Sequence, residues 1–201
     1  MRTSGRLEAV SGAAGVDEVG RGALAGPLVV AAVILPDDFD VEGLDDSKKL
    51  TESQRRVQNE RILKDACCSV VFIEPEEIDR INILQATLAG MTRAVAGLGV
   101  LPRIALVDGN QLPALNCPGQ TVIKGDGTYA AIAAASIIAK VARDEFMRSA
   151  AKDFPGYGFE GNVGYGAKEH LEGLASLGPC ILHRRSFEPV KSMVNQPCLD
   201  L

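Results

Sequence analysis

The chain has 201 residues, a length typical of one domain or of one domain with a small extension. Hydrophobic residues make up 46% and charged residues 23%, so the chain can bury a core and is not composed like a disordered tail. Aromatic residues are only 4%, and the net charge is −5. These values argue against a protein that stacks many bases on aromatic rings and against a polybasic nucleic-acid binder. A nucleic-acid enzyme stays open, because cation-binding carboxylates themselves add negative charge.

Five cysteines without a Cys-x-x-Cys pair, together with only two histidines, are too few well-spaced ligands for a structural zinc site. Their odd number predicts reduced thiols and a cytoplasmic location. The first 18 residues lack a convincing apolar segment for a signal peptide. The longest uncharged runs, residues 22–36 and 127–139, are shorter than the roughly 20 residues that cross a bilayer. We therefore expect a soluble protein that does not bind membranes, and a monomer.

Strands and helices alternate along the chain. Two strands are predicted within residues 16–35, joined by a glycine-rich connection, and the second of them (28–35) is continuously apolar. A helix over 51–66 opens with the capping-box pattern Thr51-x-x-Gln54, and a strand follows over 67–73.

Pro75 then opens a predicted helix in which apolar residues recur at near-helical spacing as far as Gly97 or Gly99. Further strands are predicted over 103–107 and 121–123, and helices over 128–149 and 167–177. We expect residues from about 192 to be a flexible tail. This alternation predicts an α/β fold.

Four acidic residues lie where predicted strands end: Asp17 and Glu18 after the first strand, Asp108 after the strand 103–107, and Asp126 between two glycines. Functional groups gather at such ends in α/β sheets. Carboxylates brought together repel unless a cation binds, and oxygen ligands without Cys or His suit Mg²⁺ or Mn²⁺. Alternatively, an Asp before Gly is an ordinary turn residue, and Asp126 could be the N-cap of the following helix.

Seven blocks in order resemble the bacterial ribonuclease HII family. They are GVDEVGRGALAGP (15–27), DSKKL (46–50), NILQA (82–86), VDGN (107–110), KGDGTYAAIAAASIIAKVARD (124–144), GYGAKEHL (164–171) and HRRSF (183–187). The resemblance implies a ribonuclease-H-like mixed β-sheet flanked by helices. It implies one catalytic domain over residues 1–201, in which residues 150–191 form a helical C-terminal extension that contributes to the substrate groove.

The resemblance also implies the activity: endonucleolytic cleavage of the RNA strand of RNA–DNA hybrids, and incision 5′ to single ribonucleotides in duplex DNA. Asp17, Glu18, Asp108 and Asp126 would be the catalytic acids and would hold two Mn²⁺ or Mg²⁺ ions. Gly20, Arg21 and Gly22 would contact the ribose 2′-hydroxyl and the adjacent backbone. Tyr165 would pack against the sugar on the 3′ side and favour the RNA-to-DNA junction.

Other candidate substrate contacts have equally plausible local roles. Lys48 follows an acidic loop and could meet a phosphate or remain a solvated lysine. Asn82 could contact the DNA strand or cap local backbone. Lys140 and Arg143 share one face of the predicted long helix with Ser136 and could bind phosphates, although Arg143 could instead pair with a neighbouring acid.

Two rival functions remain for the sequence. One is the sister family, ribonuclease HIII, whose members usually have a large N-terminal binding domain and a glycine motif without this arginine. The other is a catalytically silent protein that binds hybrids. Four intact acids and the short segment before Asp17 favour an active ribonuclease HII. The sequence identifies no protein partner.

Overall fold

The computed structural model describes residues 7–195 and contains a five-stranded mixed sheet. The strand order is β3-β2-β1-β4-β5. β1 (Ala13–Val19) pairs antiparallel with β2 (Leu28–Ile34) and parallel with β4 (Ile104–Asp108), which pairs parallel with β5 (Gly119–Val122). β3 (Cys67–Ile73) lies at the β2 edge.

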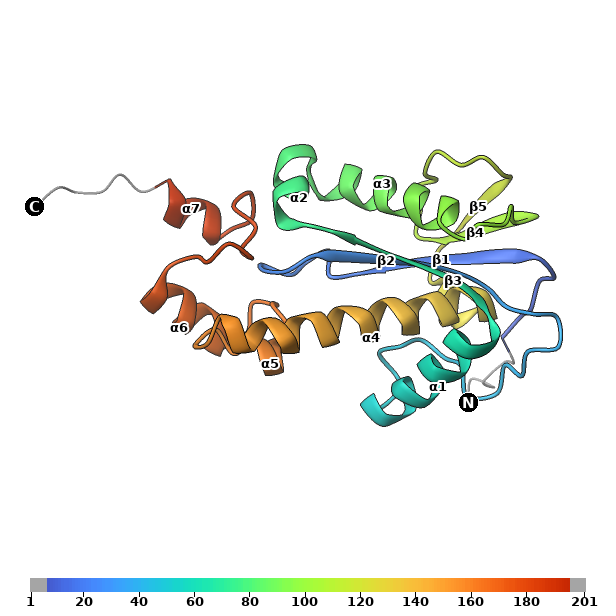
Figure 1. Cartoon of the computed structure of the whole chain (residues 1–201). Coiled ribbons are helices and arrows are strands. Elements are labelled where there is room, and N and C mark those ends of the chain that lie inside the picture. The colour runs from blue at the N-terminus through green and yellow to red at the C-terminus, as the bar shows by residue number, and fades with distance from the viewer. Residues whose placement is uncertain (1–6, 196–201) are drawn as a thin grey trace, which may run out of the picture. The chain divides into compact units, whose positions relative to one another are not determined.

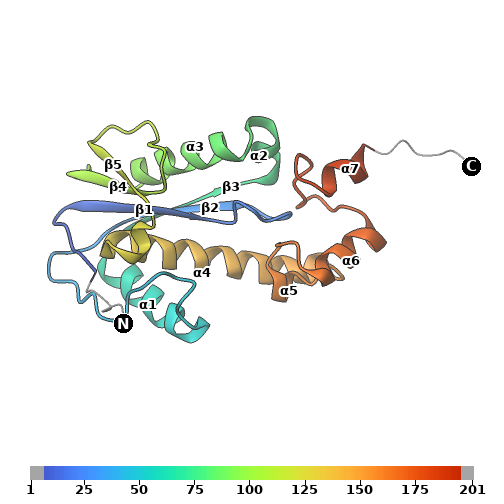
Figure 2. The ribbon, with the colours of Figure 1, turned by 180° about the vertical axis from the view of Figure 1, so that it is seen from behind.

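Helices cover both faces of this sheet. Figures 1 and 2 show α3 (Ile83–Ala96) over one face, and α4 (Ala130–Asp153) and α1 (Glu52–Asp65) over the other. The predicted α/β fold, a mixed sheet flanked by helices, is therefore confirmed.

The long helix α4 packs close to the sheet because small residues face it. One core cluster joins the inward side chains of β2 to alanines and isoleucines of α4 and to Ile62 of α1. A Cβ on Gly15 of β1 would lie 2.0 Å from the carbonyl carbon of Ala131, so the two backbones are in direct contact there. Only glycine permits this approach.

Local sequence signals set several element ends. Thr51 accepts a hydrogen bond from the Gln54 amide, and the Gln54 side chain accepts one from the Thr51 amide, which confirms the capping box. The single helix expected from Pro75 is wrong, because Asn82 adopts a left-handed φ of 66° and divides it into α2 (Pro75–Ile81) and α3. Its side chain then accepts hydrogen bonds from the Leu84 and Gln85 amides and caps α3.

The chain divides into two compact units. The first comprises the residues up to Val19, Val29–Phe72 and Thr87–Ala142, and it holds most of the sheet. The second comprises Gly20–Leu28, Ile73–Ala86 and the residues from Arg143 onward.

The second unit has its own core and its own short helices. Tyr157, Phe159 and Val163 pack with Ala25 and Met147. Its helices include α5 (Phe159–Asn162), α6 (Lys168–Leu177) and α7 (Val190–Val194). α7 therefore continues to Val194, within the segment expected to be a flexible tail, and residues 196–201 of that tail lie outside the described part of the chain. Within residues 7–195, no helix is long and apolar enough to cross a membrane.

A candidate carboxylate centre and its neighbouring loops

The strand register brings Asp17 and Asp108 to the same place along the sheet. The parallel pairing of β1 with β4 runs through Val16 opposite Val107, and the next residue on each strand is the acid. Asp17 is only 6% exposed. Two carboxylates from distant parts of the sequence are thus neighbours because their strands are adjacent and parallel.

Burial and negative charge act together on Asp17. Burial is the largest cause that raises its pKa well above the ordinary value, and the charges of Glu18 and Asp108 raise it further. The Ser136 hydroxyl and the Glu18 amide oppose this increase by hydrogen bonding, the amide to Asp17 Oδ1 at 2.7 Å. Consecutive strand residues alternate faces, yet Glu18 still acts electrostatically on Asp17.

Asp126 joins this group through a tight turn. The Gly125 amide donates a hydrogen bond of 2.7 Å to Asp108 Oδ1, which ties the 3₁₀ turn η1 (Gly125–Gly127) to the end of β4. Burial raises the pKa of Asp126, and the charges of Asp46 and Asp108 raise it further, whereas Lys48 lowers it. Asp126 is not the N-cap of α4, because α4 begins four residues later, at Ala130.

The chemistry of these side chains fits a hard divalent cation. All four donors are carboxylates, and the pKa values of Asp17 and Asp126 are raised partly by neighbouring negative charges that a cation would offset. The acids are linked pairwise: Glu18 with Asp17, Asp17 with Asp108, and Asp108 with Asp126. Within residues 7–195, no three His, Cys, Asp or Glu side chains form a ready-made ligand set for one ion.

Three polar residues that the sequence pattern does not assign to this centre lie beside it. Ser136 of α4 hydrogen-bonds Asp17, and its hydroxyl lies 2.9 Å from that of Ser47, which is also buried. Asp46 is the strongest charge acting on Asp126. The block at residues 46–50, which contains Asp46 and Ser47, is the sequence signal that could identify these two residues.

The loop at residues 20–27 belongs to the second unit and has a strained start. Gly20 has a φ of +91°, and a Cβ there would lie 2.2 Å from Arg143 Nε. Glycine is therefore required at this position for two independent reasons. A Cβ on Gly22 would meet nothing within 4 Å, so a side chain at this position would cause no steric clash.

The expected contact between Arg143 and substrate phosphate is wrong. Arg143 is fully buried, and its guanidinium donates to the carbonyls of Pro27 at 2.9 Å, Val163 at 2.8 Å and Ala25 at 3.0 Å. These bonds occupy the side chain with backbone oxygens, so it shapes the loop rather than facing solvent.

Arg184 acts in the same way on the same loop. It is fully buried and donates to the carbonyls of Gly26, at 2.9 and 3.1 Å, and Arg21, at 3.0 Å. Burial and the nearby charge of Arg143 lower its pKa to about 9. Two buried cations therefore hold the carbonyls of residues 21, 25, 26 and 27 in place.

Tyr165 lies in the second unit, with its side chain partly accessible. It is 37% exposed, and the Arg143 guanidinium lies 5.2 Å from the centre of its ring. Its amide donates to the Asn162 carbonyl at 3.0 Å. A partly exposed ring on a fixed backbone suits a contact surface.

The remaining candidates are placed as follows. Lys48 is exposed, and its charge lowers the pKa of Asp126. Asn82 is exposed, and its cap confirms the local role that the sequence allowed. Lys140 is half-buried on α4. Direct substrate contact by each stays a prediction.

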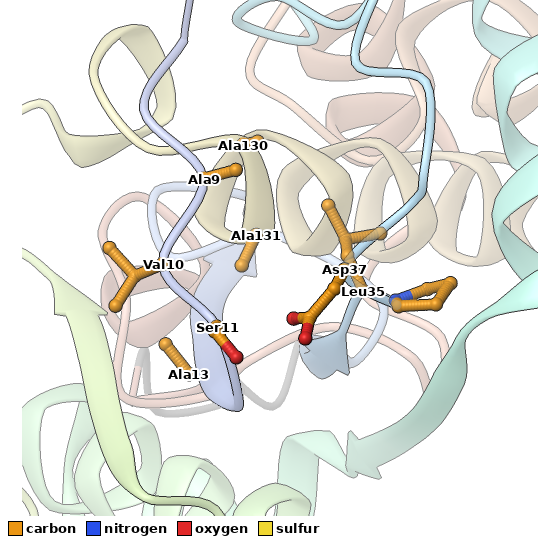
Figure 3. A pocket seen from close by; sticks show the side chains of 9 residues that line it. Ala9, Val10, Ser11, Ala13, Leu35, Asp37, Ala130 and Ala131 are labelled. Atoms are coloured by element: carbon orange, nitrogen blue, oxygen red, sulfur yellow. The ribbon is translucent and has the colours of Figure 1, made fainter.

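A small pocket in the first unit does not involve the acids (Figure 3). It has a volume of about 160 Å³, and its lining includes Val10, Leu35 and Pro36. Ser11 and Asp37 supply its only polar side chains. None of the four acids lines it, so the carboxylate centre remains the candidate site.

Comparison with known proteins agrees with this geometry. Residues 14–190 match the ribonuclease HII family. The chain belongs to the ribonuclease HII family. It is 52% identical to a ribonuclease HII of Delftia acidovorans over 183 residues, which cover 90% of this chain and 78% of the relative. It is 53% identical to a ribonuclease HII of Maricaulis maris over 180 residues, which cover 89% and 83%.

A solved structure shares the fold. The ribonuclease HII of Archaeoglobus fulgidus, solved as a complex with PCNA, is 29% identical, with a TM-score of 0.77 over 94% of this chain and 98% of its own. Ribonuclease HII enzymes are endonucleases that hydrolyse the RNA strand of RNA–DNA hybrids, and this chain is such a ribonuclease H.

Proposed function

We propose that this ribonuclease HII also incises duplex DNA 5′ to a single embedded ribonucleotide, so that it removes misincorporated ribonucleotides. The products would carry a 5′-phosphate and a 3′-hydroxyl. The observation that supports the catalytic centre most strongly is the linked charge of Asp17 and Asp108, side by side at the ends of two parallel strands. The negative charge of two adjacent carboxylates favours binding of a divalent cation, which would contact a phosphodiester.

The four acids, Asp17, Glu18, Asp108 and Asp126, would hold two divalent ions, Mn²⁺ or Mg²⁺, whose chemistry is to lower the pKa of a water and to stabilise a leaving oxygen. Asp17 is positioned by its strand and by hydrogen bonds from Ser136 and the Glu18 amide. Asp108 is positioned by the Gly125 amide. These contacts limit the movement of the Asp17 and Asp108 carboxylates before any ion binds.

Recognition of the ribonucleotide would depend on the second unit. Gly20, Arg21 and Gly22 would contact the 2′-hydroxyl, the one group that distinguishes RNA from DNA at a given nucleotide. Their support is the fixed backbone that Arg184 holds at the Arg21 carbonyl. Tyr165 would pack against the next sugar on the 3′ side, where a deoxyribose fits better than a ribose. Residues 150–191 would form part of the substrate groove.

The test compares two carboxylate-to-amide variants on one substrate. A duplex with one ribonucleotide is incubated with Mn²⁺ or Mg²⁺ and with wild type, Asp17→Asn or Asp37→Asn. Asp37 is an exposed acid that lines the small pocket, so it is the matched control. We expect Asp17→Asn to lose at least about 100-fold in rate, because one metal ligand is removed.

Asp37→Asn should cut like wild type. Full activity of Asp17→Asn, or no incision by wild type beside the single ribonucleotide, would contradict the proposal. Calorimetric titration of Mn²⁺ into both variants separates loss of metal binding from loss of a later step.

A further inference from the structure

The two histidines form a buried pair in the second unit. His170, on α6, is fully buried, and His183 is 2% exposed. Their Nε2 atoms lie 3.0 Å apart, which is a hydrogen-bond distance. The rings are enclosed by aromatic neighbours: Tyr157 lies 4.9 Å from the His183 ring, and Phe159 lies 5.1 Å from the His170 ring.

Backbone groups at both ends fix where the protons lie. The Cys180 amide, which can only donate, lies 2.9 Å from His183 Nδ1, so that nitrogen accepts. A neutral His183 therefore has its proton on Nε2 and donates it to His170 Nε2. His170 then has its proton on Nδ1, which lies 2.9 Å from the Tyr165 carbonyl, a group that can only accept.

The chain of hydrogen bonds thus runs in one direction, from the Cys180 amide through both rings to the Tyr165 carbonyl. A third proton on either ring would place two donors against each other. In keeping with this geometry, burial lowers the pKa of His170, and burial together with the nearby His170 lowers the pKa of His183 to about 4. Titratable groups near the pair include the Tyr157 hydroxyl and the Cys180 thiol, and burial raises the pKa of both.

The pair also joins the two segments that the proposed function uses for recognition. His183 forms a bridge with Ala25, and the adjacent Arg184 amide donates to the Leu24 carbonyl at 2.9 Å, so this end is attached to the loop at residues 20–27. The other end is the carbonyl of Tyr165.

We propose that His170 and His183 are a positioning pair with fixed, opposite tautomers, which holds the Tyr165 turn against the loop at residues 20–27. The pair does not touch substrate and transfers no proton during the reaction. It acts through Tyr165, and this part of the proposal rests on the proposed function.

The tautomers can be measured without any activity. The chain contains only two histidines, so long-range ¹H–¹⁵N correlation spectra of labelled protein show two imidazoles. We expect one ring protonated at Nδ1 and the other at Nε2, and both rings neutral at pH 7. Identical tautomers, or a doubly protonated ring at pH 7, would overturn the assignment.

The positioning role is tested by two variants of one residue. In His170→Asn, the side-chain amide replaces Nδ1–H and can still donate to the Tyr165 carbonyl. In His170→Gln, the longer side chain can accept from His183 but has no donor near that carbonyl. Both replace a buried imidazole with an amide, so we expect their melting temperatures to be similar.

The readout is the ratio of kcat/KM on a duplex with one ribonucleotide to kcat/KM on a uniform RNA–DNA hybrid. We expect His170→Gln to lower this ratio about two- to tenfold, the range for one lost hydrogen bond, and His170→Asn to retain most of it. In a Tyr165→Ala background, His170→Gln should cause no further loss, because it acts through Tyr165.

Equal ratios for the Asn and Gln variants, or a full additional loss in the Tyr165→Ala background, would refute the positioning role. If wild type itself fails to incise at a single ribonucleotide, the proposed function fails, while the spectra still decide the tautomers.

Discussion

Mild acid should destabilise this protein through its buried histidines. The pKa of His183 is about 4 in the folded chain, against an ordinary value of 6.5, because the ring is buried beside His170. Between these two values, the unfolded chain binds a proton that the folded chain does not. The free energy of unfolding therefore falls as the pH decreases from about 6.5 towards 4.

The size of the effect follows from the difference between the two pKa values. The whole difference for His183 corresponds to roughly 3 kcal/mol, of which about 2 kcal/mol is lost between pH 7 and pH 5. Burial also lowers the pKa of His170, so its contribution has the same sign. The raised pKa values of Asp17 and Asp126 act in the opposite direction, because protonating those groups relieves an unfavourable charge.

The assay is urea unfolding at pH 7, 6 and 5 in the presence of a chelator, for wild type and for His183→Asn. Asn keeps an acceptor for the Cys180 amide but cannot titrate, and the contributions of the acids cancel in the comparison. We expect the variant to be less stable at pH 7 but to lose about 2 kcal/mol less than wild type on going to pH 5. Parallel losses in the two proteins would refute the reasoning.

Two substitutions test the packing that holds the site. Gly15→Ala should lower the free energy of unfolding by about 3 kcal/mol, because its Cβ would overlap the backbone of Ala131. The control is Gly161→Ala, in open space, which should be neutral or slightly stabilising. Equal melting temperatures for the two variants would contradict the close packing at Gly15. Arg143→Met should lower the free energy of unfolding by about 3–5 kcal/mol and lower activity at all salt concentrations, because three backbone carbonyls lose their donor. The control is Lys152→Met, at an exposed position of the same helix, which should change both little. If Arg143→Met instead keeps its melting temperature but binds substrate more weakly and with a changed salt dependence, Arg143 contacts a substrate phosphate directly.

Prediction from sequence succeeded where the signal is local. The Thr51 capping box, the apolar strand before Asp108 and the alanine-rich helix each depend on residues within one turn, one strand or one helix. It failed at Asn82, because apolar residues keep helical spacing across the break, while the left-handed backbone at that residue is not visible in the pattern.

For the site, the sequence named the four acids by their position after strands and by resemblance to ribonuclease HII. The pairing register decided that Asp17 and Asp108 are neighbours. Sequence could not separate Lys140 from Arg143, three residues further along the same helix. Their burial in the folded chain distinguishes them, since Arg143 is fully buried and Lys140 is not.

The order of residues thus determined the family, the α/β architecture and the identity of the acidic side chains, because these depend on composition, periodicity and motifs along the chain. Tertiary structure alone decided which acids interact electrostatically, which arginines are buried, and which tautomer each histidine of the pair adopts. Each of those properties depends on groups far apart in sequence, and on the water that folding removes from around them.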